Sequence, residues 1–203
     1  NPYLGTTFNR ARLVRTDPED RSRLLPFEKA CAATIDRRIV DPQKLPRERI
    51  AEVSRLAVRA RYRRRKGESD NPAPINDEDF GTQNQPRFPY IPIGLYLGAV
   101  AMAHRSNIST LFVLTEPRLA SHFAKLGVDI RQIGGAVEHR GARVPSMMDV
   151  ESIIRNMRFL VKPMWRVILE EIDHSLNLRA AETSPSGREG QPVAPPWWQS
   201  VLT

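Results

Sequence analysis

The chain has 203 residues, 40% hydrophobic and 27% charged, a composition typical of one globular domain with a core of its own. Its net charge of +8 indicates an acidic partner: nucleic acid, an anionic membrane, a phosphorylated small molecule or an acidic protein. No apolar run reaches membrane-spanning length, and the single cysteine excludes an internal disulfide. The sequence therefore predicts a soluble, cytoplasmic protein.

The first half of the chain predicts two strands separated by loops. Residues 8–15 (FNRARLVR) alternate as in a half-buried strand, and residues 50–58 (IAEVSRLAV) predict a second strand. Residues 27–33 between them indicate a short helix or turn. Residues 68–92 are rich in Pro, Asn and Asp, which predicts an irregular loop or an insertion.

The second half alternates predicted helices with predicted strands. The helices are expected at residues 93–106, 117–126, 150–158 (capped by Asp149) and 163–178. The strands are expected at residues 108–114, 128–133 and 136–143. From residue 182 the chain is rich in Pro, Gly and Ser, which predicts a mobile tail. This order predicts a mixed α/β domain with one central sheet.

A basic segment, residues 59–67 (RARYRRRKG), follows the second strand directly. Backbone N–H groups in such a turn bind phosphate oxygens, and arginine side chains add bidentate contacts. The long loop that follows separates this segment from the next helix, so a solvated or nucleic-acid-contacting face stays an open alternative to a phosphate site.

Glu52 and Arg55 are charged residues in an otherwise apolar strand. Residues three apart point to opposite faces of a regular strand, whereas a β-bulge between them brings both to one side. A buried Glu52 would then accept a proton from an amine nucleophile, directly or through water. The alternative is an ordinary pair of edge charges.

Other chemistry-bearing residues show no catalytic pattern. Cys31 has no nearby histidine in the sequence to activate it, which favours a small buried core residue. The four histidines lack metal-ligand spacing, so no metal site is expected. Glycine-rich nucleotide-binding motifs and the nucleophile elbow of hydrolases are absent from the sequence.

The segment AEVSRLAV, followed by YRRRKG, resembles a signature of the acyl-homoserine-lactone synthases. It is also similar to their relatives, the N-acyl amino acid synthases and the acyltransferases associated with PEP-CTERM/exosortase systems. Glu52, Ser54, Arg55 and Val58 match the family's Glu-x-Ser-Arg strand and the valine after it. Arg12 (in RARLV) and Phe27 (in LPFE) resemble its preceding Arg-bearing strand and its aromatic position. Downstream, three segments are similar to the last two branches: IGLYLGAVAMA, EPRLASHFAKLGVDIRQIGG and EHRGARVP.

The resemblance implies a GNAT-like α/β fold. Its mixed central sheet is splayed to admit a thioester arm between two strands, and it is flanked by helices, with additional helices at the C-terminus. Residues 1–180 would form this acyltransferase domain, and residues 181–203 a flexible Pro-rich tail. Family members carry an N-terminal segment that closes the amine site. Because this chain begins just before the Arg12 strand, we expect that part of the family's fold to be absent from it.

The implied activity is transfer of a fatty acyl group from acyl carrier protein, or from acyl-coenzyme A, to the amine of an amino acid or amino-acid derivative. Both donors carry the acyl chain on phosphopantetheine, so the resemblance implies acyl-phosphopantetheine as a co-substrate and no permanently bound cofactor. An acidic carrier protein suits the positive net charge. A lipid product would also allow peripheral membrane association, and nucleic acid is not expected as a partner.

The resemblance also implies roles for individual residues. Glu52 and Arg55 form the catalytic pair. The substrate-binding residues are Arg12, Phe27 and Ser54. The phosphopantetheine-binding residues are Val58, Arg61, Arg63, Arg64, Arg65 and Gly67. Two alternatives stay open: a catalytically inactive carrier-protein-binding domain, and a nucleic-acid-binding module, for which Tyr62 is the one stacking aromatic in the basic run.

Overall fold

The computed structural model describes residues 10–58, 73–74, 81–82, 85–86, 90–116, 123–124, 127–139 and 141–183. The chain divides into two compact units, Asn1–Ile172 and Asp173–Thr203, and the first unit contains the sheet and the site described below. Three predictions lie wholly or mostly outside the described residues: the basic segment 59–67, the helix at 117–126, and the flexible tail at 181–203. Residues 181–183 of that predicted tail are instead the end of the last helix.

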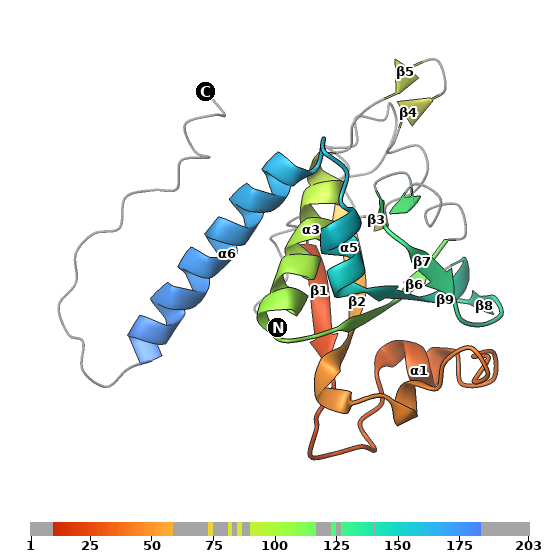
Figure 1. The fold of residues 1–203 in the computed structure, drawn as a ribbon. Coiled ribbons are helices and arrows are strands. Elements are labelled where there is room, and N and C mark those ends of the chain that lie inside the picture. The colour runs from red at the N-terminus through yellow and green to blue at the C-terminus, as the bar shows by residue number, and fades with distance from the viewer. Residues whose placement is uncertain are drawn as a thin grey trace. The chain divides into compact units, whose positions relative to one another are not determined.

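A central sheet organises the first unit (Figure 1). Its main strands lie in the order β1 (Arg10–Arg15), β2 (Ile50–Val58), β6 (Thr110–Thr115), β9 (Ala142–Asp149) and β7 (Ile130–Gln132). Of the strand pairs that the structure describes, only β2 and β6 run parallel, so the sheet is mixed as predicted.

Two short strands extend this sheet, and two form a separate pair. Strand β3 (Ala73–Pro74) pairs with β2, and β8 (Val137–Glu138) pairs with β9. Strands β4 (Gly81–Thr82) and β5 (Gln85–Pro86) pair with each other. Strands β3, β4 and β5 lie within residues 68–92, where the sequence predicts an irregular loop or insertion.

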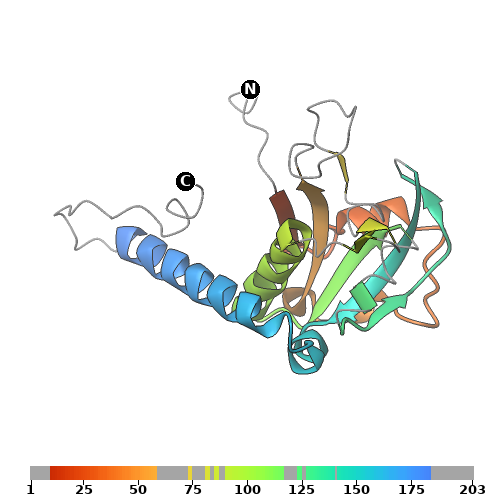
Figure 2. The same cartoon turned by 90° about the horizontal axis from the view of Figure 1, so that it is seen from above.

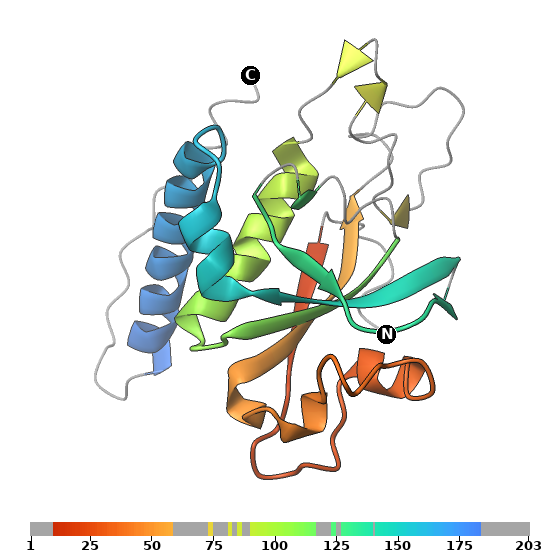
Figure 3. The same cartoon turned by 45° about the vertical axis from the view of Figure 1, so that its right-hand side comes forward.

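The helices are unequally shared between the two faces of the sheet. Their bounds are α1 (Pro26–Ala30), α3 (Tyr90–Arg105), α5 (Val150–Asn156) and α6 (Lys162–Thr183), with 3₁₀ turns η1 (Pro42–Lys44) and η2 (Arg47–Arg49). Figure 2 shows α3 on one side of β1 and β2 and the orange α1 on the other. Figure 3 shows α1 and the 3₁₀ turns gathered beneath the strands.

Side chains alternate between two hydrophobic clusters because successive residues of a strand point to opposite faces. Ala51 and Val53 of β2 belong to the larger cluster, with the buried residues of α3 and α5. Ile50 of β2 and Phe112 of β6 belong to the smaller cluster, with Phe27 of α1. The same parity directs Glu52 toward the α1 side.

Strands β2 and β6 separate along their length. They pair from Ile50 opposite Thr110 to Val53 opposite Val113, yet β2 continues to Val58 and β6 to Thr115. Figure 2 shows the free ends of the brown β2 and the green β6 diverging. The predicted α/β fold, with a mixed central sheet flanked by helices and with further helices toward the C-terminus, is confirmed.

A bulge in β2 lies beside this separation. Ser54 is opposite Arg12 and Ala57 is opposite Arg10, so three steps along β2 match two steps along β1. The extra residue therefore falls between Ser54 and Ala57, a span that contains Arg55. The sequence-based hypothesis put the bulge between Glu52 and Arg55, slightly earlier in the strand. The side chain of Arg55 lies outside the described residues.

Several predicted elements are confirmed, and one is wrong. Strand β2 has the predicted bounds, and Asp149 caps α5 by accepting the Ser152 N–H at 2.7 Å. Residues 136–143 do not form one strand, because the chain turns back at Gly141 (φ 96°) and returns as β9.

Strand β9 was not predicted because Pro145 interrupts it, and proline is rare in central strands. Just past the end of β7, the Ile133 N–H donates to the Pro145 carbonyl at 2.9 Å, and the Ile133 carbonyl accepts the Asp36 N–H at 2.8 Å.

Among the helices that the structure describes, none combines the length and the apolar character needed to cross a membrane.

Candidate active site

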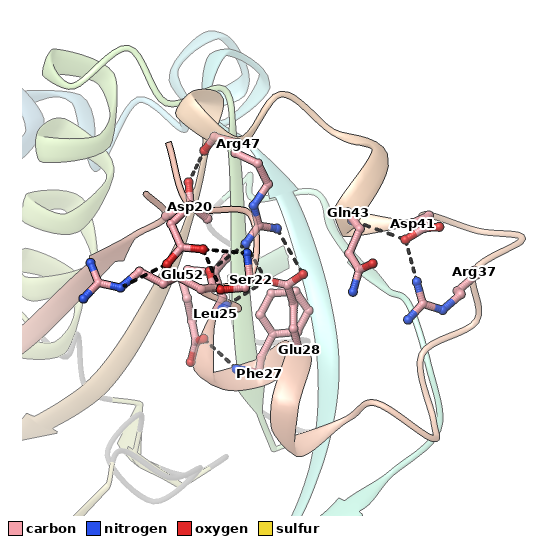
Figure 4. Close-up of polar contacts among 12 residues, drawn as sticks. Asp20, Ser22, Leu25, Phe27, Glu28, Arg37, Asp41, Gln43, Arg47 and Glu52 are labelled. Carbon is pink, nitrogen blue, oxygen red and sulfur yellow. Dashed lines mark hydrogen bonds and ion pairs between the residues drawn. The ribbon is translucent and has the colours of Figure 1, made fainter. Parts of the chain in front are cut away.

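Glu52 is buried on β2, two residues before that strand loses its pairing with β6. The residue is 3% exposed, and its carboxyl faces α1, as Figure 4 shows. Glu52 Oε2 accepts a 2.8 Å hydrogen bond from the backbone N–H of Phe27. Because Phe27 is the second residue of α1, its N–H has no acceptor within that helix. The carboxyl therefore joins the strand to the start of α1.

Burial raises the pKa of Glu52 from 4.5 to about 7. The Phe27 N–H opposes this change, the nearby carboxyl of Glu28 adds to it, and the guanidinium of Arg12 lowers the pKa. A carboxyl that titrates near neutral pH both accepts and releases a proton under physiological conditions, which is the property of an efficient general base.

A buried ion pair fixes α1 beside Glu52 (Figure 4). Arg47 donates to both carboxylate oxygens of Glu28, at 3.1 and 3.0 Å, and the two side chains are 2% and 4% exposed. Arg47 also donates to the carbonyl of Arg23, and Glu28 Oε2 accepts the Leu25 N–H at 2.7 Å. The bond from Leu25 closes the first turn of α1 in the manner of a capping box.

The ring of Phe27 is fully buried. It stacks on Phe112 of β6 with ring centroids 4.5 Å apart and an interplanar angle of 20°. Phe112 is in turn opposite Glu52 in the parallel pairing of β2 and β6. Phe27 thus contributes its N–H to Glu52 and its ring to the core, while its predicted contact with substrate stays a prediction.

Cys31 is also fully buried on this side of the sheet. Burial raises the pKa of its thiol, and the charge of Glu52 raises it further, while a hydrogen bond with Thr34 lowers it. A neutral thiol in this position behaves as a small apolar residue, as the sequence predicts.

Two of the predicted substrate-binding residues lie on the face of β1 and β2 that carries Glu52. Arg12 is opposite Ser54 and Val14 is opposite Glu52 in the antiparallel register, and opposite residues share a face. Arg12 is exposed and Ser54 is half-buried. The structure therefore brings together Arg12, Glu52 and Ser54 with the backbone of Phe27. The side chains of Arg55 and Val58, and all of residues 61–67, lie outside the described residues.

Sequence reasoning missed the buried pair of Glu28 and Arg47. Glu28 follows Leu25 by three residues and Pro26 marks a first helical position, so the start of α1 has a readable signal. Arg47 has none, because it lies within the polar run DPQKLPRER and its partner is 19 residues away. The run contains three cations, Lys44, Arg47 and Arg49, and only the folded chain shows that Arg47 is the buried one.

The described part of the chain offers no group of three or more His, Cys, Asp and Glu side chains suited to hold a metal ion. An open hollow of about 570 Å³ lies between residues 34–39 and the end of β7. Glu52 does not line it, so this hollow is separate from the candidate site.

No protein-family model and no curated protein matches the chain. Among solved structures, the chain is similar to TofI in an apo form, at 16% identity over 71% of this chain and 62% of that chain, with a TM-score of 0.41. It is similar to the AHL synthase LasI, at 14% identity over 72% and 61%, with a TM-score of 0.42. A third similar structure is the CoA-dependent acyl-homoserine lactone synthase BjaI with SAM and isopentyl-CoA, at 15% identity over 80% and 57%, with a TM-score of 0.40.

The chain spans less than two thirds of the length of each of these proteins. A likeness this weak does not establish the family. The function proposed below therefore depends on the geometry and the residues of the chain itself.

Proposed function

We propose that this chain is an N-acyltransferase that moves a fatty acyl group from a phosphopantetheine thioester to the amine of an amino acid or amino-acid derivative. The observation that carries the proposal is the position of Glu52, a buried carboxyl with a pKa raised to about 7 where two parallel strands separate. Strands that separate leave backbone N–H and C=O groups without a partner strand, and an extended arm can add there. The Glu-x-Ser-Arg resemblance around Glu52 supports the same activity.

The chemistry is direct aminolysis of the thioester. The substrate amine attacks the thioester carbonyl carbon, a C–N bond forms, and Glu52 accepts the proton that the amine loses, directly or through one water. The C–S bond then breaks, and the departing phosphopantetheine sulfur takes up a proton. Backbone N–H groups of β2 beyond Val53 would stabilise the oxyanion on the carbonyl as it forms.

The remaining roles follow from placement and charge. Arg12 and Ser54, on the same face as Glu52, would bind the carboxylate of the amino-acid substrate. Arg55 would complete the catalytic pair, while Val58 and residues 61–67 would hold the phosphopantetheine arm and its phosphate. The net charge of +8 favours acyl carrier protein as the donor, with acyl-coenzyme A as the alternative.

The proposal predicts that Glu52→Gln lowers kcat/KM by roughly 100-fold or more, because the amide cannot accept the proton. In the unaltered chain, kcat/KM should rise with pH and level off above an apparent pKa of about 7. The assay combines the chain with long-chain acyl carrier protein or acyl-coenzyme A and a panel of amino acids, and detects the amide by mass spectrometry. Glu48→Gln is the matched control, because Glu48 is exposed on η2.

Undiminished turnover in Glu52→Gln would exclude Glu52 as the base. A chain that acylates no amine and binds RNA or DNA tightly would instead favour the nucleic-acid-binding alternative. Tight binding of acyl carrier protein without turnover would identify an inactive carrier-binding domain.

Charge reversal at Arg63, Arg64 and Arg65 should raise KM for the donor and leave kcat nearly unchanged, since these residues would bind the donor's phosphate.

A further inference from the structure

Two large apolar side chains protrude from the turn between α5 and α6. Phe159 is 83% exposed and Leu160 is 77% exposed, the highest values among the large hydrophobic residues that the structure describes. They are the central residues of a turn that the Val161 N–H closes by donating to the Arg158 carbonyl at 3.0 Å. Central turn positions usually hold Gly, Asn, Asp, Ser or Pro, so two exposed apolar residues there are unusual.

The backbone on both sides of this turn is anchored. Met157 and Val161 are 6% and 2% exposed and belong to the larger hydrophobic cluster. Gly127 packs against the chain just before the turn, and a Cβ atom there would lie 2.3 Å from the carbonyl oxygen of Asn156. The exposure of Phe159 and Leu160 is therefore a fixed feature of the fold.

Positive charge surrounds the two apolar side chains. Four exposed cations occur in this part of the chain, Arg155, Arg158, Lys162 and Arg166. No Asp or Glu occurs between Glu151 on α5 and Glu170 on α6. Lys162 and Arg166 are one helical turn apart, so they lie on the same side of α6. We call residues 155–166 the basic turn region; Figure 1 shows it where α5 gives way to α6.

We propose that the basic turn region docks this protein on an anionic lipid surface, with Phe159 and Leu160 entering the interface and the four cations contacting lipid phosphates. Exposed aromatic and aliphatic side chains supply buried area at a membrane interface, and adjacent Lys and Arg add attraction to anionic headgroups. An acidic protein would also attract the cations, but it would need a pocket for two side chains that protrude from a turn. A lipid interface accepts protruding side chains without a pocket.

This inference goes beyond the proposed acyl transfer and does not depend on it, because binding is measured without turnover. The full chain is sedimented with vesicles of phosphatidylcholine and phosphatidylglycerol, and with vesicles of phosphatidylcholine alone. We expect binding to the mixed vesicles that weakens as salt is raised, and little binding to the uncharged vesicles. The double variant Phe159→Ser/Leu160→Ser should lose roughly tenfold or more in vesicle affinity.

Further variants test whether vesicle binding depends on the positive charge of the basic turn region and on the position of that charge in the chain. Lys162→Glu/Arg166→Glu should also lose roughly tenfold or more, since each cation near an anionic surface contributes roughly fivefold. Arg21→Glu/Lys44→Glu makes the same change in net charge at exposed residues elsewhere, and Ile39→Ser removes an exposed apolar side chain elsewhere. Both controls should bind vesicles within about twofold of the unaltered chain, because their residues lie outside the basic turn region.

A polarity-sensitive fluorophore at Leu160→Cys adds a direct readout, because Cys31 is fully buried and does not compete for the label. Its emission should shift to shorter wavelength with the mixed vesicles only. Equal vesicle binding by the double variants and their controls would overturn the proposal, as would equal binding to uncharged vesicles. Loss of acidic carrier protein capture in the same variants, with no vesicle binding by the unaltered chain, would overturn it in favour of protein docking.

Discussion

Glu28 and Glu52 are two buried carboxyl groups that both contact the first turn of α1. Glu28 receives the guanidinium of Arg47 in a bidentate contact, whereas Glu52 receives the amide N–H of Phe27 and, within the described residues, makes no ion pair. The ion pair with Arg47 therefore partly compensates the cost of burying the Glu28 carboxylate, whereas the single N–H of Phe27 compensates much less of that cost at Glu52. The difference explains why the pKa of Glu52 rises toward neutrality.

The raised pKa of Glu52 has a consequence for stability. The unfolded chain has the ordinary pKa of 4.5 for this group, and the folded chain has about 7. Between these two values the folded state binds more protons, so stability from this group is present below pH 4.5 and is lost as pH rises through about 7. The expected loss is about 3 kcal/mol once the pH is well above 7.

Glu52→Gln should remove this pH-dependent loss while keeping the shape of the side chain. We expect the variant and the unaltered chain to be about equally stable near pH 4, and the variant to be about 3 kcal/mol more stable near pH 9. Urea unfolding at a series of pH values measures the difference. Glu48→Gln should show no such trend, because Glu48 is exposed. A constant difference between Glu52→Gln and the unaltered chain at all pH values would contradict the raised pKa.

Among the elements, the segment after α1 is attached to the sheet through a close backbone contact at the end of β7. Ile35 bridges to Gly134, the Gly135 N–H donates to the Thr34 carbonyl at 2.9 Å, and the Asp36 N–H donates to the Ile133 carbonyl at 2.8 Å. A Cβ atom on Gly134 would lie 2.4 Å from the Thr34 carbonyl oxygen and 3.0 Å from the Ile35 Cα. Backbone atoms on both sides leave no room for a side chain.

Gly134→Ala should therefore destabilise the fold by about 2 kcal/mol, since overpacking against backbone forces the segment away from the sheet. Gly135→Ala is the matched control, because the nearest atom to its Cβ would be the Thr34 Cβ at an ordinary 3.7 Å. We expect the control to change the free energy of unfolding by less than about 0.5 kcal/mol. Chemical denaturation of both variants makes the comparison, and equal effects would refute the close-contact explanation.

The sequence predicted the bounds of β2 because the apolar pattern of a strand is local. It left open whether Glu52 is buried or is an ordinary edge charge, and the fold shows that Glu52 is buried. The sequence could not predict β9, since Pro145 interrupts the strand pattern and the strand depends on partners distant in sequence, β6 and β7. Nor could it predict the bulge's position, which is a property of the pairing between β1 and β2. The separation of β2 and β6 was expected from resemblance alone, because strand register is set by the whole sheet.

Across the whole first unit, the two faces of the sheet differ in how much core they bury. Among the described residues, the larger cluster contains nineteen buried residues and the smaller one, under α1, contains five. Regions with fewer buried apolar contacts open at lower free energy than the global unfolding transition. The α1 side of the sheet, which positions the Phe27 N–H on Glu52, should therefore be the less stable half.

Native-state hydrogen exchange followed by mass spectrometry tests this difference. Amides of residues 26–31 should exchange through openings of lower free energy than amides of residues 95–103 in α3.

Arg47→Met should speed exchange at residues 26–31 by roughly a hundredfold, because it leaves the Glu28 carboxyl buried without its partner, and should change α3 much less. Lys44→Met, at an exposed residue, is the control. Equal opening free energies in both regions, or equal acceleration of both by Arg47→Met, would show that the two faces unfold as one unit and that the Glu28–Arg47 pair stabilises the whole sheet.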